Sequence, residues 1–113
     1  MKLKQAREII SHYHDLNELN EAVAFIFENA SAKEILDLLF YLENLNYFDS
    51  TDRPYDRKDF VLKILSIGDK KVLEELCDER NIDLCLGKNI DLYSRAMSEF
   101  NELKTQKQPG EDQ

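Results

Sequence analysis

The stretch Ile35–Pro54, ILDLLFYLENLNYFDSTDRP, decides the fold class of this chain. Ten of its first fourteen residues are apolar, and the chain has neither Gly nor Pro before Pro54. Wound as an α-helix, the stretch brings five side chains within an arc of about 120°. These five are Ile35, Leu38, Leu39, Leu42 and Leu45. An apolar arc of this kind predicts a helix that packs one face into a hydrophobic core.

A second apolar arc lies roughly opposite the first, and a third edge lies beside Asp37 and Asn44. The second arc holds Leu36, Phe40 and Tyr47, and the third edge holds Tyr41 and Phe48. A helix with two apolar arcs is usually packed between neighbours in a bundle, so we predict that most of the stretch is buried. The alternative is that part of it is exposed and binds a partner. The candidates for that role are Leu36, Phe40, Tyr41 and Tyr47.

The rest of the chain repeats the helical pattern, with apolar residues three and four positions apart between polar capping residues. The predicted helices are Leu3–His14, Leu16–Asn29, Ala32–Phe48, Arg57–Ile67, Lys70–Arg80 and Ile90–Lys104. The predicted N-caps are Asp15, Ser31, Asp56, Asp69 and Asn89, and Gly68 is predicted to end a helix in a left-handed conformation. Residues 82–87 are predicted to form a turn or a short helix.

The fold class that follows is all-α, a compact antiparallel bundle of five to six helices without a sheet. The chain has 113 residues, of which 42% are hydrophobic, which is enough for one core. Residues 1–104 are therefore predicted to form a single domain. Residues 105–113, TQKQPGEDQ, are polar and interrupted by Pro and Gly, so a disordered tail is expected there.

The formal net charge is −8, and the acidity is concentrated in one third of the chain. Residues 15–52 contain nine acidic residues and a single base, Lys33, which gives this segment a net charge of −8. Such a surface repels nucleic acid and anionic lipid and attracts basic protein surfaces. A solvated face without a partner is the simpler interpretation of the same pattern.

The residues that carry chemistry do not assemble into a known motif. His12 and His14 point about 200° apart on a regular helix, so they cannot chelate one metal. Cys77 and Cys85 match neither a CxxC pair nor a zinc knuckle, and two reduced thiols are expected. No phosphate loop or nucleophile elbow occurs. We therefore expect no enzyme activity, no metal and no cofactor.

Membrane and nucleic-acid partners are also not expected. The N-terminal residues carry charges throughout, and no segment approaches about 18 consecutive apolar residues, so a cytoplasmic protein is predicted. The one basic cluster, Arg53, Arg57 and Lys58, is interleaved with acidic residues. The remaining function class is a domain that binds another protein.

The order of the helices resembles that of death effector domains. The segment EILDLLFYLENLNYFDSTD resembles the fourth helix of that family, DFVLKIL and KKVLEEL resemble the helices that follow, and ELNEAVAFIF resembles the second helix. The likeness covers roughly residues 6–80. The chain departs from the family at Asp69–Val72, where the charges of the Arg-x-Asp-Leu signature are reversed, and it lacks the small third helix.

The resemblance implies docking between like domains and a possible homo-oligomer. The apolar residues that it assigns to the two docking faces are Phe25 and Ile26 on one side, and Tyr13, Phe40 and Tyr41 on the other. The alternative is a small acidic inhibitor, of the immunity or anti-transcription-factor type, that binds a basic target through its acidic face. The acidic candidates are Glu18, Glu21, Asp37, Asp49 and Asp52.

Overall fold

The computed structural model describes residues 1–49, 54–78 and 90–106, and within these ranges the regular secondary structure is helical, with no strand. The α-helices are α1 (Leu3–Ser11), α2 (Leu16–Asn29), α3 (Ala32–Asn44), α4 (Arg57–Ile67), α5 (Lys70–Leu76) and α7 (Ile90–Gln106), and a 3-10 helix, η1, spans Tyr47–Asp49. The predicted all-α fold class is confirmed. The predictions for residues 82–87, for the Asn89 cap and for a tail over 107–113 lie outside the described residues.

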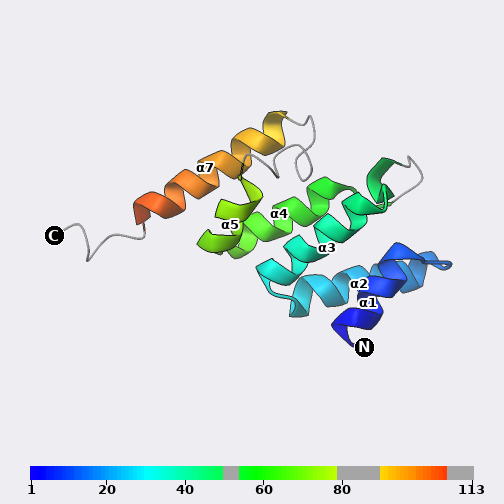
Figure 1. Cartoon of the computed structure of the whole chain (residues 1–113). Helices are drawn as coiled ribbons and strands as arrows, with labels where there is room; N and C mark the ends of the chain where they lie inside the picture. The colour runs from blue at the N-terminus through cyan, green and yellow to red at the C-terminus, as the bar shows by residue number, and fades with distance from the viewer. Residues whose placement is uncertain (50–53, 79–89, 107–113) are drawn as a thin grey trace.

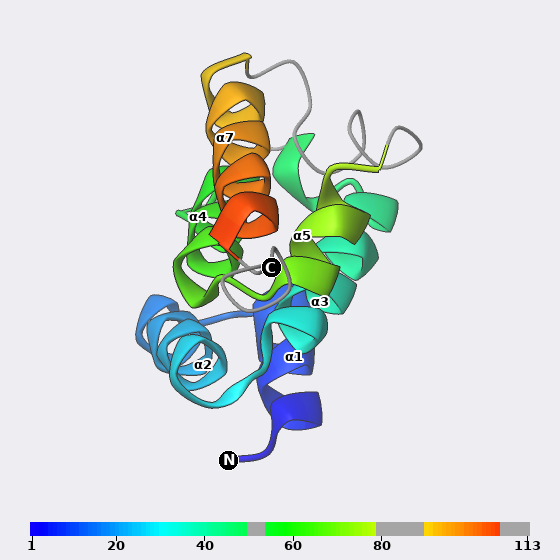
Figure 2. The ribbon, with the colours of Figure 1, turned by 90° about the vertical axis from the view of Figure 1, so that its left-hand side faces the viewer.

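Successive helices alternate in direction and are laid side by side in chain order (Figure 1). α1 packs chiefly on α2, α3 on α4, and α5 on α7. The α1–α2 pair and the α5–α7 pair lie at opposite ends, and α3 and α4 lie between them (Figures 1 and 2). Helix α3, which contains most of the stretch that decides the fold, therefore occupies the middle of the bundle.

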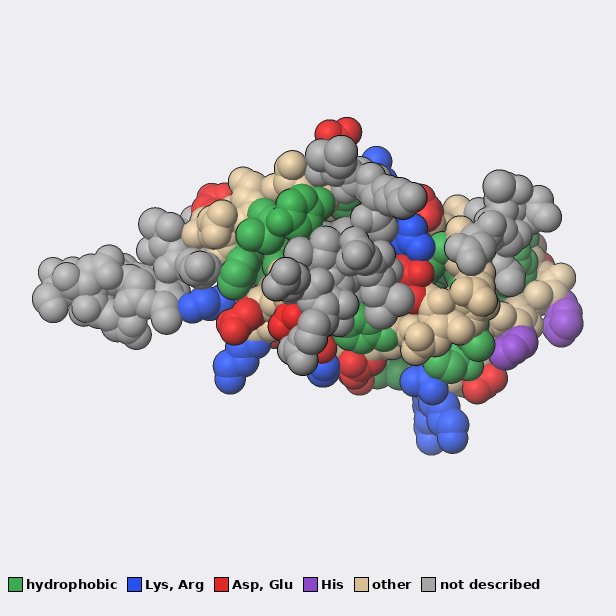
Figure 3. All heavy atoms as spheres, turned by 45° about the horizontal axis from the view of Figure 1, so that its top comes forward, with side chains coloured by type: hydrophobic (Ala, Val, Ile, Leu, Met, Phe, Trp, Pro, Cys, Tyr) green, Lys and Arg blue, Asp and Glu red, His purple; other side chains and the backbone are tan. Residues whose placement is uncertain are grey.

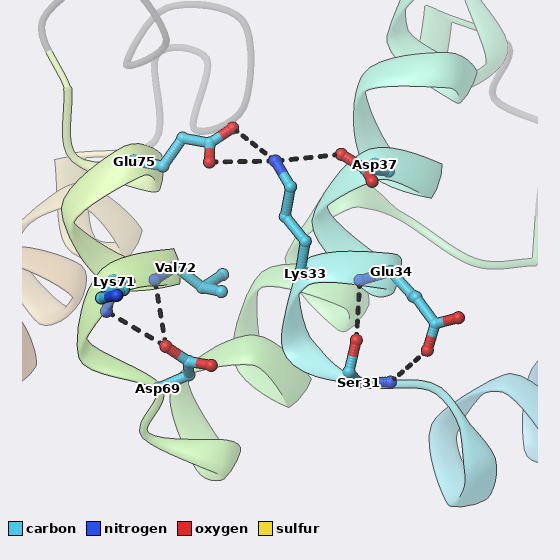
Figure 4. Close-up of polar contacts among 8 residues, drawn as sticks. All are labelled: Ser31, Lys33, Glu34, Asp37, Asp69, Lys71, Val72 and Glu75. Atoms are coloured by element: carbon cyan, nitrogen blue, oxygen red, sulfur yellow. Dashed lines mark hydrogen bonds and ion pairs between the residues drawn. The ribbon is translucent and has the colours of Figure 1, made fainter.

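The predicted capping residues set the starts of the helices. Ser31 accepts from the amide of Glu34 at 3.1 Å, and the Glu34 carboxylate accepts from the amide of Ser31 at 2.8 Å, which completes a capping box (Figure 4). Asp56 forms a second box with Asp59. Asp15 caps α2 through the amide of Asn17 alone, without the expected reciprocal contact from Glu18. Each cap satisfies amides that have no partner inside the helix.

Gly68 separates α4 from α5 with φ 74° and ψ 30°, in the left-handed region predicted for it. A side chain there would meet no atom within 4 Å, so the requirement for Gly is one of backbone conformation alone. Asp69 then caps α5 by accepting from the amides of Lys71 and Val72 (Figure 4). The sharp joint between α4 and α5 is thus encoded by two adjacent residues.

Three helices end earlier than predicted, and α5 is one of them, since it ends at Leu76 with Cys77 as its C-cap rather than at Arg80. α1 stops at Ser11, whose hydroxyl donates to the carbonyls of Arg7 and Glu8 at 3.0 and 3.1 Å. Such back-bonding competes with the helix ladder. α3 stops at Asn44 rather than Phe48, because Asn46 adopts a positive φ of 57° that a helix cannot continue through.

The apolar arcs of α3 are buried more completely than the sequence predicts. Leu36 and Tyr47, two of the four candidates for partner binding, are enclosed by the core, so this interpretation of them is wrong. The neighbours on both sides of the helix cover them. Leu45 is 46% exposed although it was assigned to the core, because the helix ends before it.

The predicted inner face of α7 is displaced. The spacing of Ile90, Tyr93, Met97 and Phe100 predicts an apolar stripe on this helix. Phe100 packs partly buried against the core, but the buried residues are Leu92 and Ala96, and Tyr93 is 36% exposed. Hydrophobic side chains consequently reach the surface at this end of the molecule (Figure 3). The predicted stripe was the more hydrophobic of the two, but the packing of α5 and α4 on α7 selects the other one.

Two contacts fix α2 to the middle of the bundle. The rings of Phe27 on α2 and Phe60 on α4 meet edge to face, with centroids 5.6 Å apart. The hydroxyl of Tyr55, just before α4, donates to Asn20 of α2 at 2.7 Å.

In the described ranges no helix has the length and apolar character to cross a bilayer.

Candidate functional site

An acidic stripe runs along the exposed side of α2, and we define it as Glu18, Glu21, Phe25 and Glu28. These positions are spaced three, four and three residues apart, so their side chains fall within an arc of about 80° on the helix. The three glutamates are exposed, and the Phe25 ring is half-buried between them. None of the three glutamates forms an ion pair within the described part of the chain.

The aromatic candidates from the sequence are all partly accessible. Phe25, Tyr13, Phe40 and Tyr41 are half-buried against the core, on three different helices or their ends. The Arg7 guanidinium lies over the Tyr41 ring, 4.4 Å from its centroid. A cation in that position covers one face of the ring and joins α1 to α3.

Ile26 differs from its aromatic neighbours. It is only 4% exposed and belongs to the central core cluster. On α2 it points about 100° away from Phe25, toward α1 and α3 rather than toward solvent. The structure therefore does not bring Phe25 and Ile26 onto one exposed patch.

The acidic candidates are distributed over two helices. Glu18 and Glu21 are exposed on α2, and Asp37 is exposed on α3. The structure does not describe the side chain of Asp49, and Asp52 lies outside the described residues. Of the five predicted acidic residues, Glu18 and Glu21 belong to the acidic stripe, and Asp37 lies on α3 outside it.

Asp37 takes part in a small charge network that the sequence did not reveal. Lys33 Nζ lies 3.0 Å from both carboxylate oxygens of Glu75 on α5 and 3.3 Å from Asp37 Oδ1 (Figure 4). The hydrogen bond to Glu75 raises the pKa of Lys33 above its ordinary value. Because Lys33 and Glu75 are far apart in sequence, no local pattern could have predicted the pair.

A hollow of about 360 Å³ opens where the N-terminal half of α1 meets the end of α2 and the start of α3. Its lining residues are Leu3, Lys4, Arg7, Ile26, Ala30, Glu34, Asp37 and Leu38. We call the aliphatic members the floor of the hollow, the bases contributed by α1 its basic wall, and the acids contributed by α3 its acidic wall. The view in Figure 2 shows these three helices meeting near the N-terminus.

The sequence held only weak signals for this hollow. Lys4 and Arg7 are three residues apart, as are Glu34 and Asp37, so each pair lies on one side of its own helix. Nothing local indicates that the two sides face a common space. That arrangement depends on how α1 packs against α2 and α3.

Across the described ranges, no group of three or more His, Cys, Asp or Glu side chains is placed to hold a metal ion. Both histidines are exposed at the α1–α2 end of the molecule (Figure 3). Cys77 is half-buried, and its burial raises the pKa of the thiol above the ordinary value.

No protein-family model matches the chain, and it has no significant match to a curated protein or a solved structure. The functional assignment therefore depends on the chemistry of the surface itself.

Proposed function

We propose that this chain is a non-enzymatic protein-interaction module that binds a basic protein through the acidic stripe of α2. The observation that carries the proposal is the grouping of three exposed glutamates, which form no ion pair within residues 1–49, 54–78 and 90–106, around one partly accessible aromatic ring. Residues 15–52, which include the whole stripe, hold the net charge of −8. A basic partner would be drawn to this side of the molecule before contact is made.

The composition of the stripe supports binding in addition to attraction. Aromatic side chains at the centre of a contact supply much of its binding energy when a partner encloses them, and surrounding charges give specificity and rate. Phe25 is the central ring here, and its three glutamate neighbours form no ion pair with the described residues that binding would have to break. A surface arranged in this way suits a target with Lys or Arg around an apolar pocket.

The test compares the wild-type chain with the triple variant Glu18→Gln, Glu21→Gln, Glu28→Gln as bait for proteins of the native host. We expect the wild-type chain to capture a basic protein whose binding weakens about tenfold or more between low and physiological salt, because exposed charges are screened. The triple variant should lose this capture. The matched control, Glu8→Gln, Glu74→Gln and Asp91→Asn, removes three exposed acids elsewhere and should retain it.

The proposal fails if the captured protein is acidic, or if both triple variants behave alike. The first result would exclude charge attraction as the basis of binding. The second would show that only net charge matters and that the stripe is not a specific surface.

A second candidate function is docking between like domains, as the resemblance to death effector domains implies. The observation that favours it is the partial exposure of Phe25 on α2 and of Phe40 and Tyr41 on α3. In that case sedimentation should show oligomers that grow with concentration and depend little on salt, and Phe25→Arg should abolish them. If the chain stays monomeric at every concentration, binding to a basic protein is the better explanation of this surface.

A further inference from the structure

The hollow between α1, α2 and α3 differs in charge from the rest of the molecule. Lys4 and Arg7 line it, and neither forms an ion pair within the described residues. Across from them, Glu34 accepts the Ser31 amide at 2.8 Å and Asp37 pairs with Lys33 at 3.3 Å. Lys4, Arg7 and Glu34 therefore have no oppositely charged partner among the described residues, so two free positive charges and one free negative charge border the hollow, on a chain whose net charge is −8.

The floor is apolar and only slightly exposed. Ile26 and Leu38 are buried, and Leu3 and Ala30 are partly accessible beside them. The volume of about 360 Å³ is near the lower end of the range for binding pockets. It suits one or two inserted side chains rather than a large ligand. An apolar floor that is bordered by two cations selects a ligand in which an aliphatic group lies next to an anion.

The acidic wall, Glu34 and Asp37, further restricts the class of ligand that the hollow can bind. A carboxylate has about four acceptor positions, so Glu34 and Asp37 retain some beyond those used by Ser31 and Lys33. A ligand that meets both walls needs an anionic group on one side and N–H donors on the other. A peptide carries such donors in its backbone and in basic side chains, whereas a fatty acid carries none.

We propose that this hollow binds a peptide segment of a partner protein in which an aliphatic side chain is followed by a carboxylate. The aliphatic group packs on Ile26 and Leu38, the carboxylate pairs with Lys4 and Arg7, and a donor meets the acidic wall. The site is separate from the acidic stripe and binds a ligand of opposite charge. It goes beyond the proposed function, and either proposal can fail while the other holds.

The experiment is an NMR titration of the ¹⁵N-labelled full chain with the blocked tripeptide acetyl-Lys-Leu-Glu-amide. We expect saturable shifts at the amides of Leu3, Ile26 and Ala30, with a dissociation constant of about 1 mM, as is typical for so small a ligand. Replacing Glu in the peptide by Gln should weaken binding about tenfold, because the charge-assisted hydrogen bonds are lost. Replacing Leu by Ala should weaken it by a similar factor.

Variants of the protein test separately how much the walls and the floor contribute to binding. Lys4→Glu and Arg7→Glu should each weaken binding about tenfold. Lys71→Glu makes the same charge change at an exposed position of α5 and should leave binding unchanged. Ala30→Leu fills the floor and should abolish binding with no change in charge. The amide spectrum of each variant shows whether it remains folded. Since Arg7 also contacts Tyr41, Lys4→Glu tests the wall without disturbing that contact.

Three results would overturn the proposal. The first is the absence of saturable shifts around the hollow at about 10 mM peptide. The second is an equal response to Lys4→Glu and Lys71→Glu, which would reduce the effect to net charge. The third is that decanoate shifts the same amides as strongly as the peptide, which would assign the hollow to a lipid-like carboxylate instead.

Discussion

Arg57 forms a two-point ion pair with Glu43 that joins the start of α4 to the end of α3. Its Nη2 donates to Glu43 Oε1 at 2.9 Å and its Nε donates to Oε2 of the same carboxylate. The Glu43 side chain is only 8% exposed, and the Arg57 guanidinium also lies near the Phe48 ring. The carboxylate has little contact with water, so its stabilisation depends on Arg57, which is the one cation that pairs with it in the described part of the chain.

We therefore expect Arg57→Leu to lower the free energy of unfolding by about 2 kcal/mol, because it leaves a nearly buried carboxylate without its partner. The double variant Glu43→Leu, Arg57→Leu should recover much of this loss, since no uncompensated charge remains. Urea denaturation of both variants measures the difference. If the double variant were as unstable as the single one, packing of the Arg57 side chain would explain the effect rather than charge.

At the scale of helices, the capping residues carry most of the information that fixes where each one begins. The Ser31 box is complete on both sides, and its helix supplies the largest part of the core. Ser31→Ala removes the acceptor for the Glu34 amide, so we expect a loss of about 1 kcal/mol in the free energy of unfolding. Ser94→Ala, an exposed change inside α7, is the matched control, and it should cost nothing. Equal effects in urea denaturation would show that the box contributes no stability.

The accuracy of the sequence predictions follows from how local each signal is. α2 and α4 have the predicted bounds because Asp15, Asp56 and Gly68 act within a few residues of their own position. The end of α3 was missed because it depends on the left-handed conformation of Asn46, for which Asn is only one of several suitable residues. The buried face of α7 was missed because neighbouring helices choose between two apolar stripes.

The same difference between local and long-range signals explains which candidate sites were found from the sequence. Glu18 and Glu21 were named from the sequence because they lie in the acidic segment of residues 15–52, whereas their grouping with Glu28 around Phe25 was recognised only from the exposed side of α2. The hollow was not found, since Lys4 and Arg7 meet Glu34 and Asp37 only after three helices have packed. Ile26 was assigned to an exposed patch because its position cannot be distinguished from that of Phe25 without knowing which side α1 covers.

At the scale of the whole molecule, the uneven charge should make stability depend on salt. Residues 15–52 hold nine acids and one base, and five of these acids, Glu18, Glu21, Glu28, Glu34 and Asp37, are exposed on α2 and α3. At about 10 mM salt the screening length is about 30 Å, long enough for these charges to repel one another across the bundle, whereas at about 150 mM it is about 8 Å.

We therefore expect the folded state to gain about 1 kcal/mol between these salt concentrations, which corresponds to a rise in melting temperature of about 4 °C for a domain of this size. Thermal unfolding followed by circular dichroism measures the change. The variant Glu18→Gln, Glu21→Gln, Glu28→Gln should start from a higher melting temperature at low salt and respond less, because it has lost three of the repelling charges. A melting temperature that falls with salt would mean that attraction within pairs such as Arg57–Glu43 and Lys33–Glu75 outweighs the repulsion. The charge of the acidic stripe would then not destabilise the folded state, and it would affect only the binding of a partner.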